Sequence, residues 1–318
     1  MAVLVLVLVA ACSSGGGQPE RYQLEKPKIK LGVLPVVGAA SVFLAKDNGY
    51  FDAEGLNVEF VTIQGAGAAV PAMATGQLDL VFGNYVSFFT AEAKNEVEVR
   101  FLADGYFAEP RTWMVLVGKD SKLQKASDIG GKKVAVTTTS SLADLTVKAV
   151  LGTSGSTVAS PTFVEMAYTD MGAALLNHTV DAALLAEPYI TDVSKRTGAI
   201  PLFDAASGPT ASFPISGYAT TEKFANANPN TIRAFQRALS KGAALAGSDR
   251  TAVEKAVHKF ANVDEQTASL MTMVGYPTRL DPTRLQRVPD LMYSYGIIPA
   301  RLDVHPLILP SAMSDPHP

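Results

Sequence analysis

The sequence predicts an α/β protein of two doubly wound α/β lobes joined by a two-crossing hinge. Strand patterns alternate with helix patterns, as they do in βαβ units around a parallel sheet. The same alternation returns about 100 residues later in the chain, which indicates a second lobe of the same kind. Hydrophobic residues make up 47% of the 318 residues and charged residues 18%, so a sizeable core can be buried.

The first lobe is expected to begin near Lys28. We predict in turn a strand, a helix, a strand, a helix and a strand, over residues 29–34, 39–48, 56–63, 65–75 and 78–82. Gly49 follows the first helix, and glycine readily adopts the backbone conformation that ends a helix. The last strand is an almost unbroken apolar run, which is typical of a parallel strand buried on both faces.

The second lobe is expected to repeat this order. We predict a strand over 133–137, a helix from Ser140 or Ser141 onward, a strand over 162–166, a helix over 171–177 and a strand over 180–185. Two residue pairs align the copies, because Phe60 and Asp79 are 19 positions apart and Phe163 and Asp181 are 18 apart. This agreement favours a weak internal duplication, and chance similarity between two βαβ units is the alternative.

Two extended segments, 113–117 and 215–219, are expected to cross between the lobes. They place residues 28–112 and 217–318 in the first lobe and residues 113–216 in the second. Apolar residues at helical spacing predict three further helices that pack on the first lobe, over 229–246, 251–261 and 265–274. Two crossings form a hinge about which the lobes can close on a ligand.

The N-terminal segment resembles an export signal followed by a lipid attachment site. Residues 1–11 are all apolar; they are too few to span a bilayer, where about 20 are needed, but typical of a signal peptide. The residues ending at Cys12 resemble a bacterial lipobox, so we predict that Cys12 is lipidated and that residues 12–27 form a flexible linker. No Lys or Arg precedes the apolar run, which a start codon placed too far downstream would explain. The alternative is a short buried segment with a core cysteine.

Composition and spacing argue against several other functions. The formal net charge is −3 and no basic run occurs, so we expect no nucleic-acid partner. A single cysteine and four scattered histidines give no metal-ligand spacing. Residues 65–67 lack the third glycine of a dinucleotide fingerprint, and Ser140 lies in no G-x-S-x-G motif. We therefore expect no metal, no cofactor and no serine nucleophile.

Four motifs in chain order resemble those of a known family. They are LAKDNGYFDAEGLNVE at 44–59, a small-residue helix and strand at 65–82, SDIGGKKVAV at 127–136, and a D-A-hydrophobic to E-P-Y segment at 181–189. Over most of residues 29–250 the chain is similar to ABC-transporter solute-binding proteins for sulfonates, taurine, nitrate and thiamine-precursor pyrimidines. The resemblance implies a periplasmic-binding-protein fold of the second topological type, a small ligand in the cleft, and a membrane permease as partner. It also implies that the protein acts as a monomer.

Candidate ligand-binding residues follow the predicted strands, where strand ends and helix N-termini meet. Helix N-termini offer unpaired backbone N–H groups and a partial positive charge, both of which favour an anion. These loops contain glycines together with hydroxyl, amide, aromatic and carboxylate side chains. The candidates are Gly38, Ser41, Gly65, Asn84, Tyr85, Trp113, Thr138, Thr139, Ser140, Ser141, Glu187 and Tyr189.

The run of hydroxyl residues from Thr137 to Ser141 indicates the chemistry of the ligand. One hydroxyl is enough to cap a helix, and five exceed that need. Apart from Arg111 near the hinge, no Lys or Arg lies in a predicted cleft loop, so a monoanion such as a sulfonate or carboxylate fits best. The alternative is a neutral or cationic heteroaromatic ligand bound by Glu187 and an aromatic residue. Glu187 could equally anchor the hinge, and Trp113 could pack beneath it.

The expected function is transport. An extracytoplasmic lipoprotein, anchored to the membrane, would bind a small organic solute and deliver it to an ABC importer. The resemblance also extends to pyrimidine-precursor synthases of the same fold, which need a lysine and a histidine in the cleft and a cysteine-rich motif. Cys12 is the sole cysteine and no histidine lies in a predicted cleft loop, so we expect no enzyme. A sensory ligand-binding domain is a third alternative, and it would need a separate output partner.

Overall fold

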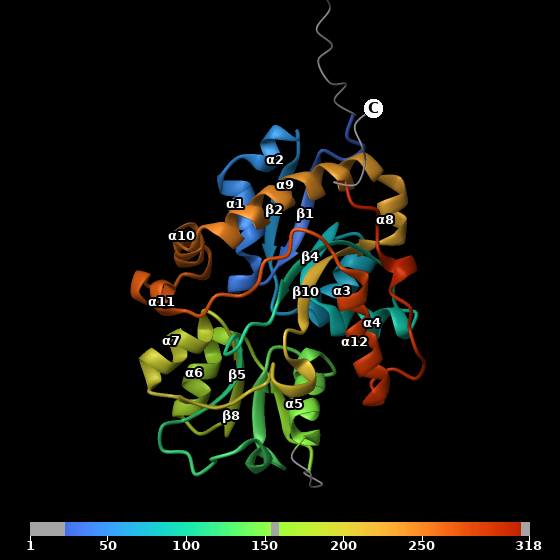
Figure 1. The fold of residues 1–318 in the computed structure, drawn as a ribbon. Coiled ribbons are helices and arrows are strands. Elements are labelled where there is room, and N and C mark those ends of the chain that lie inside the picture. Colours follow the sequence, from blue (N-terminus) through green and yellow to red (C-terminus); the bar gives the residue numbers. More distant parts are fainter. Residues whose placement is uncertain (1–22, 154–158, 313–318) are drawn as a thin grey trace, which may run out of the picture.

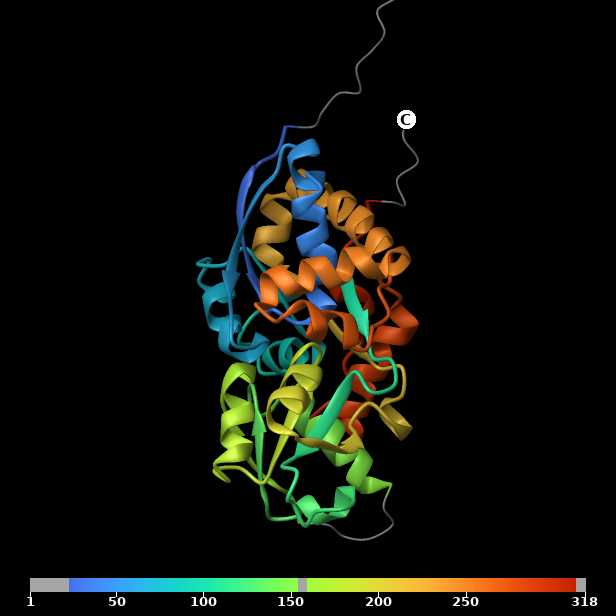
Figure 2. The ribbon, with the colours of Figure 1, turned by 90° about the vertical axis from the view of Figure 1, so that its left-hand side faces the viewer.

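The computed structural model describes residues 23–153 and 159–312, which form two lobes, one above the other in Figure 1. Each lobe contains a five-stranded sheet surrounded by helices (Figure 2). This architecture confirms the predicted fold class of two α/β lobes. Within the described ranges, no helix is long and apolar enough to cross a membrane. The signal peptide and the lipidation site Cys12 lie outside the described residues and stay predictions.

The first sheet joins strands from distant parts of the chain in the order β2-β1-β3-β10-β4. β1 runs parallel to β2 and β3, whereas β10 runs antiparallel to β3 and β4. A strand that forms late in the chain is thus inserted between β3 and β4. The strands of this sheet are β1 (Lys28–Val33), β2 (Asn57–Thr62), β3 (Leu80–Asn84), β4 (Val99–Phe107) and β10 (Pro214–Thr221).

The second sheet repeats this arrangement in the order β7-β6-β8-β5-β9. β6 runs parallel to β7 and β8, and β5 runs antiparallel to β8 and β9. β5 therefore occupies the place that β10 occupies in the first sheet. β5 is the first strand after the chain crosses into the second lobe, and β10 is the first strand after it returns to the first lobe. The strands of this sheet are β5 (Trp113–Val117), β6 (Lys133–Val136), β7 (Thr162–Glu165), β8 (Ala182–Ala186) and β9 (Ile200–Asp204).

The two strands that the sequence placed at the hinge do not cross it. β5 pairs within the second sheet and β10 within the first. The crossings are instead the connections from β4 to β5 and from β9 to β10, over residues 108–112 and 205–213. Residues 214–216, assigned from the sequence to the second lobe, begin β10 of the first. A short apolar run has the same pattern in a sheet as at a crossing, so the pattern alone does not separate the two.

Helices pack around both sheets, mostly where the sequence predicted them. The first lobe carries α1 (Ala40–Asp47), α2 (Tyr50–Ala53), α3 (Ala66–Ala74), α4 (Tyr85–Ala93), α8 (Glu222–Ala227), α9 (Pro229–Ser248), α10 (Arg250–Ala261), α11 (Glu265–Leu270) and α12 (Pro282–Ser294). The second lobe carries α5 (Leu142–Gly152), α6 (Tyr168–Leu176) and α7 (Tyr189–Thr197). Gly49 has the left-handed backbone (φ 68°) expected after α1. α11 ends before the predicted residue 274, because Met271 has an extended backbone.

Asp79 and Asp181, which the sequence spacing aligned, make the same contacts in the two lobes. The Asp79 carboxylate accepts the N–H of Lys30 at 2.9 Å, and the Asp181 carboxylate accepts that of Lys133 at 2.8 Å. Each aspartate's own N–H donates to the carbonyl of the same lysine. The aligned positions are therefore equivalent in the structure, as the predicted repeat requires.

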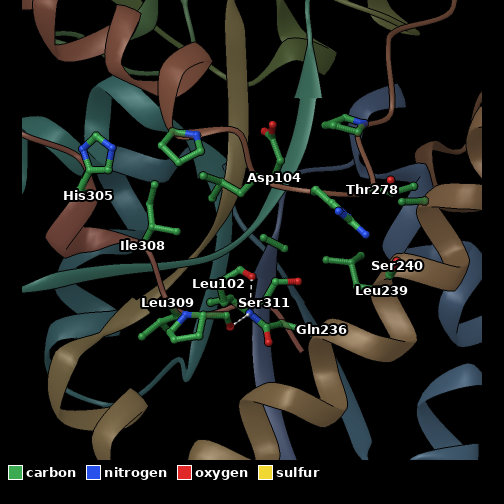
Figure 3. Close-up of a pocket in the computed structure, with 17 residues that line it drawn as sticks. Leu102, Asp104, Gln236, Leu239, Ser240, Thr278, His305, Ile308, Leu309 and Ser311 are labelled. Atoms are coloured by element: carbon green, nitrogen blue, oxygen red, sulfur yellow. Dashed lines mark hydrogen bonds between the residues drawn. The ribbon is translucent and has the colours of Figure 1, made fainter. Parts of the chain in front are cut away.

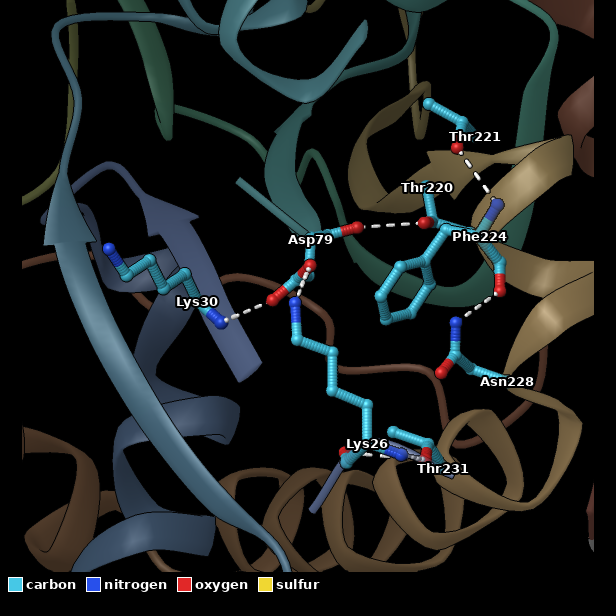
Figure 4. Close-up of polar contacts among 8 residues, drawn as sticks. All are labelled: Lys26, Lys30, Asp79, Thr220, Thr221, Phe224, Asn228 and Thr231. Carbon is cyan, nitrogen blue, oxygen red and sulfur yellow. Dashed lines mark hydrogen bonds and ion pairs between the residues drawn. The ribbon is translucent and has the colours of Figure 1, made fainter. Parts of the chain in front are cut away.

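Asp79 is buried, and its contacts connect the start of the first lobe to the sheet (Figure 4). Its other carboxylate oxygen pairs with Lys26 Nζ at 2.7 Å, and its carbonyl accepts the Thr220 hydroxyl of β10 at 2.7 Å. The N–H of Lys26 donates in turn to the Thr231 hydroxyl of α9. Asp79 thus connects the residues before β1 to β10 and, through Lys26, to α9.

Asp79→Ala is expected to lower the free energy of unfolding by about 1–3 kcal/mol, because the Lys30 N–H and the half-exposed Lys26 ammonium lose a buried acceptor. Asp181→Ala is the matched control from the second lobe, where the equivalent carboxylate is exposed and water can replace it. Urea unfolding of both variants measures the difference. Equal losses for the two variants would contradict this account.

The segment after α12 returns along the outer edge of the first sheet. Ile308 forms a parallel bridge to Phe101 of β4, and the N–H of Leu309 donates to the Phe101 carbonyl at 2.8 Å. Val304 and Leu307 of this segment are buried. The C-terminal part of the chain, for which the sequence suggested no role, therefore covers an edge strand that would otherwise be open to pairing.

Candidate ligand-binding site between the lobes

A narrow cavity lies between the lobes, and both lobes form its walls. The first lobe contributes the loops after β1 and β2, the end of β3 and parts of β4 and β10. The second contributes the loop after β6 and the starts of α5 and α6. The cavity volume is about 30 Å³, which is room for one or two water molecules. The lobes are thus closed on each other, and a larger ligand must enter by opening the hinge.

Three helix N-termini meet at this cavity. Its wall includes Gly65, Asn84 and Ser141, which are the N-cap residues of α3, α4 and α5. The Asn84 side-chain oxygen accepts the N–H of Ser87 at 2.8 Å, so the amide NH₂ of Asn84 remains available as a donor. Ser141 and Asp144 form a capping box at α5. The first N–H groups of a helix have no partner within the helix, so the three ends together present donors and partial positive charge to the cavity.

The cavity wall holds no acidic, basic or histidine side chain among the described residues. Its polar side chains include the hydroxyls of Tyr106, Thr137, Tyr168 and Ser216. Burial raises the pKa of Tyr106 and Tyr168 above the usual tyrosine value, so both stay protonated donors at neutral pH. Neutral donors and helix ends without a fixed counter-charge suit a monoanion better than a cation or a dianion.

Apolar and aromatic side chains form the rest of the wall. Leu34, Phe82, Trp113 and Ile215 are among them. The indole N–H of Trp113 is already bonded to the Thr146 hydroxyl at 3.1 Å, so Trp113 offers the ligand its ring and not a donor. The site therefore combines a polar end for a head group with an apolar surface for an organic tail.

Close packing of Thr138 on two glycines marks the contact between the lobes beside the cavity. A Cβ atom at Gly65 would lie 2.4 Å from Thr138 Oγ1, and one at Gly67 would lie 2.7 Å from Thr138 Cγ2. Gln64 of the same loop donates to the Thr137 carbonyl at 3.3 Å. Thr138 Oγ1 and Ser87 Oγ are buried with no hydrogen-bond partner among the described residues. Both hydroxyls lie where α3, α4 and the second lobe meet, outside the cavity wall.

The structure brings four of the predicted candidates, Gly65, Asn84, Trp113 and Ser141, to the cavity wall, and Thr138 to its border.

Three candidates of the first lobe lie in its core and not at the cavity. Gly38 is buried against Tyr106, and the Ser41 hydroxyl is hydrogen-bonded to that of Tyr218 at 3.2 Å. Tyr85 is fully buried, and its hydroxyl donates to Asp104 at 2.7 Å. All three residues belong to helical segments whose buried faces hold them away from the cavity.

Two hydroxyl residues of the second lobe face solvent. Thr139 and Ser140 are exposed, and the N–H and hydroxyl of Thr139 donate to the Glu165 carboxylate at 2.6 and 2.7 Å. These bonds lower the pKa of Glu165. Ser140 has a left-handed backbone (φ 50°), which turns the chain so that Ser141 points inward while the preceding residues point out. The hydroxyl run therefore forms a turn at Thr139 and Ser140 and contributes Thr137 and Ser141 to the cavity wall.

The last two candidates lie behind the wall. Tyr189 is buried and stacks on Tyr168, with ring centroids 5.0 Å apart, so it supports a residue that lines the cavity. Burial raises the pKa of Tyr189 to about 12. Glu187 is 1% exposed, and its carboxylate is bonded to Thr191 and Thr272 and not directed at the cavity. Of the two roles considered for Glu187, the structure supports anchoring.

Sequence reasoning missed several residues of the wall. Tyr106 lies on β4, a strand that the pattern did not predict, and Ser216 lies on β10, which was taken for a crossing. Phe82 and Tyr168 also line the wall. Pairing of β10 with both β3 and β4 brings Phe82, Tyr106 and Ser216 together. That pairing joins segments more than 100 residues apart, so no local signal marks it.

A second cavity of about 390 Å³ lies on the first lobe, beneath the C-terminal segment (Figure 3). Asp104, Gln236 and Ile308 are among its walls. Asp104 and Gln236 are already paired there, because Asp104 accepts from Arg284 and Gln236 donates to the Leu102 and Pro310 carbonyls. The candidate ligand site is the smaller cavity, because both lobes form its walls. In the described ranges, no three His, Cys, Asp or Glu side chains are grouped so that they could hold a metal ion.

Two α/β lobes around a cavity of convergent helix ends define the periplasmic-binding-protein fold class. The sequence model of the family described as NMT1/THI5 like matches residues 38–250, and the chain belongs to this family.

Three known proteins are similar to this chain. A protein of Bacillus subtilis (strain 168), provisionally named as an aliphatic sulfonates-binding protein, is 26% identical over 246 residues, which cover 75% of this chain and 70% of that protein. The alkanesulfonate-binding protein SsuA of Xanthomonas axonopodis pv. citri, bound to MOPS, has a TM-score of 0.74 at 19% identity and covers 89% of this chain and 98% of its own. The periplasmic nitrate-binding protein NrtA of Synechocystis PCC 6803 has a TM-score of 0.74 at 14% identity, over 88% of this chain and 84% of its own. The two structural similarities show a shared fold.

Proposed function

We propose that this protein captures a small organic monoanion, with a sulfonate or carboxylate head group, and delivers it to an ABC importer. The observation that carries the proposal is the convergence of three helix N-termini on a cavity without charged side chains. The apolar wall at Leu34, Trp113 and Ile215 favours an organic tail over a bare inorganic ion. The heteroaromatic alternative needs the Glu187 carboxylate in the cavity, where it does not lie.

The relatives support the same ligand class. Two of the three are named for aliphatic sulfonates or alkanesulfonates, and one of these was solved with MOPS, itself a sulfonate. The extracytoplasmic location, the lipid anchor at Cys12, the permease partner and the monomeric state belong to this proposal as well. They are supported by the lipobox-like N-terminus and by the similarity to binding proteins named for sulfonates and nitrate.

A thermal-shift screen of the full chain tests the proposal. The panel contains methanesulfonate, hexanesulfonate, MOPS, hexanoate, nitrate and a pyrimidine. A ligand that binds the folded state stabilises it, by about 2.7 kcal/mol at a hundred times its Kd. We expect hexanesulfonate or MOPS to raise Tm. A shift confined to the pyrimidine would contradict the anion assignment.

Ligand affinity is expected to stay constant between pH 7 and 9. No group on the cavity wall titrates in this range, because burial moves the pKa of Tyr106 and Tyr168 further above 10. Both hydroxyls therefore remain donors until the solution is strongly alkaline. Calorimetric titration with hexanesulfonate at three pH values measures this, and a tenfold change across the range would place a titrating group in the site.

A further inference from the structure

Glu187 links the two lobes through its backbone and its side chain. It follows β8 of the second lobe directly and precedes α7. Its carbonyl accepts the N–H of Val37 at 2.8 Å, and its carboxylate accepts the N–H of Thr272 at 3.0 Å. Both donors belong to the first lobe, one at the short 3-10 helix Val37–Ala39 and the other just after α11. These are bonds between lobes and not within one.

The remaining acceptor sites of the carboxylate are used within the second lobe. Thr191 of α7 donates to it twice, from its N–H at 3.1 Å and its hydroxyl at 2.9 Å. Two oxygens thus receive three donors, a set that a carboxylate satisfies and that a glutamine amide, with one oxygen, would not. The side chain is held in a fixed position, aimed at the first lobe.

The contact lies next to the ligand cavity. Val36, beside Val37, lines the cavity, and so does Leu184, three positions before Glu187. The carbonyl of Val37 accepts the Tyr276 hydroxyl at 2.7 Å, so the wall segment at Val37 is bonded on both its donor and its acceptor side.

We infer that Glu187 is a positioning residue that fastens the closed lobes and slows ligand release, by holding the backbone N–H groups of Val37 and Thr272. This role rests on the proposed function, because it concerns how the captured solute is retained. Opening of the lobes separates Glu187 from both donors, and closure restores the bonds. Lys195 and Asp264, 2.6 Å apart, also join α7 and α11, but this pair is solvent-exposed and contributes little.

Proline substitution removes each N–H without touching Glu187. Met271 (φ −60°, ψ 149°) and Val36 (φ −114°, ψ 160°) have the extended backbone that a residue before proline prefers. The matched controls are Thr272→Ala and Val37→Ala, which shorten the same side chains and keep the N–H. Thermal melting shows which variants fold, and the two independent sites keep the inference testable if one proline variant does not.

The experiment measures two quantities in the same set of variants: the distance between dyes on the two lobes, and the rate of ligand release. Cys12→Ser removes the sole cysteine, and Lys119→Cys and Ala244→Cys place one dye on an exposed site of each lobe. Thr272→Pro is expected to shift ligand-free molecules toward the longer distance and to speed hexanesulfonate release about tenfold, as loss of a bond to a charged group implies. Thr272→Ala and Lys195→Ala should resemble the wild type.

The outcomes separate the two proposals. If the wild type binds hexanesulfonate and both proline variants match their alanine controls in distance and release rate, Glu187 does not fasten the lobes. If the wild type binds no anion but the proline variants still open the lobes, the fastening role stands and the ligand assignment fails.

Discussion

Replacing Gly65 by alanine is expected to weaken ligand binding roughly ten- to hundredfold, because the closed lobes leave no room for a side chain there. The new Cβ atom would lie 2.4 Å from Thr138 Oγ1 of the opposite lobe. Gly65 has an extended backbone (φ −178°), which alanine adopts without strain, so the loss comes from the contact between lobes. Overpacking costs about 1–3 kcal/mol, and 1.4 kcal/mol is tenfold in affinity. Calorimetric titration with hexanesulfonate measures the loss of affinity.

Thr138→Ala provides the suppressor for this change. The Thr138 Cβ atom lies 3.7 Å from the position of the new methyl group, an ordinary van der Waals contact, so the double variant fits. We expect Gly65→Ala with Thr138→Ala to recover most of the affinity lost by Gly65→Ala, measured relative to Thr138→Ala alone. If Gly65→Ala lowers the affinity equally in the wild type and in Thr138→Ala, closure of the lobes does not depend on the contact between Gly65 and Thr138.

Asp104→Ala is expected to lower the free energy of unfolding by about 3 kcal/mol, because it breaks a buried ion pair and leaves its partners behind. The Asp104 carboxylate is 4% exposed, and it accepts the Tyr85 hydroxyl at 2.7 Å and the Arg284 guanidinium at 2.6 Å. Tyr85 begins α4, whose N-cap Asn84 lines the ligand cavity, so the ligand site should loosen as well. Urea unfolding measures the stability change.

The control for Asp104 replaces both members of the pair by apolar residues. Asp104→Leu with Arg284→Met removes the unpaired guanidinium, so this double variant should be more stable than Asp104→Ala. If it is equally unstable, the loss comes from packing of β4 and not from the ion pair.

Local patterns in the sequence were enough to predict much of this fold. The glycine at position 49 ends α1 as expected. The similar spacings from Phe60 to Asp79 (19 positions) and from Phe163 to Asp181 (18 positions) correspond to equivalent positions in the two sheets. The loops that carry Gly65 and Ser141 were also located correctly, because a strand followed by a helix start is a local signal. These features depend only on residues close together in the chain.

Other features depend on contacts that no local pattern records. α4 is buried on almost all sides, from Tyr85 to Ala91, so its apolar residues show no helical period and the helix was not predicted. β4 was missed too, and with it Tyr106 of the cavity wall. Within the hydroxyl run, the backbone turn at Ser140 decides which side chains face the cavity, and residue type alone does not determine that.

The most direct test of the central claim is to map a bound anion onto the backbone amides by NMR of the labelled protein during titration with hexanesulfonate. The claim predicts the largest shifts at the N–H groups of Ala66, Leu142 and Ala143, which lie at the starts of α3 and α5 on the cavity wall. Shifts confined to Leu239 and Ile308, in the second cavity, would contradict it.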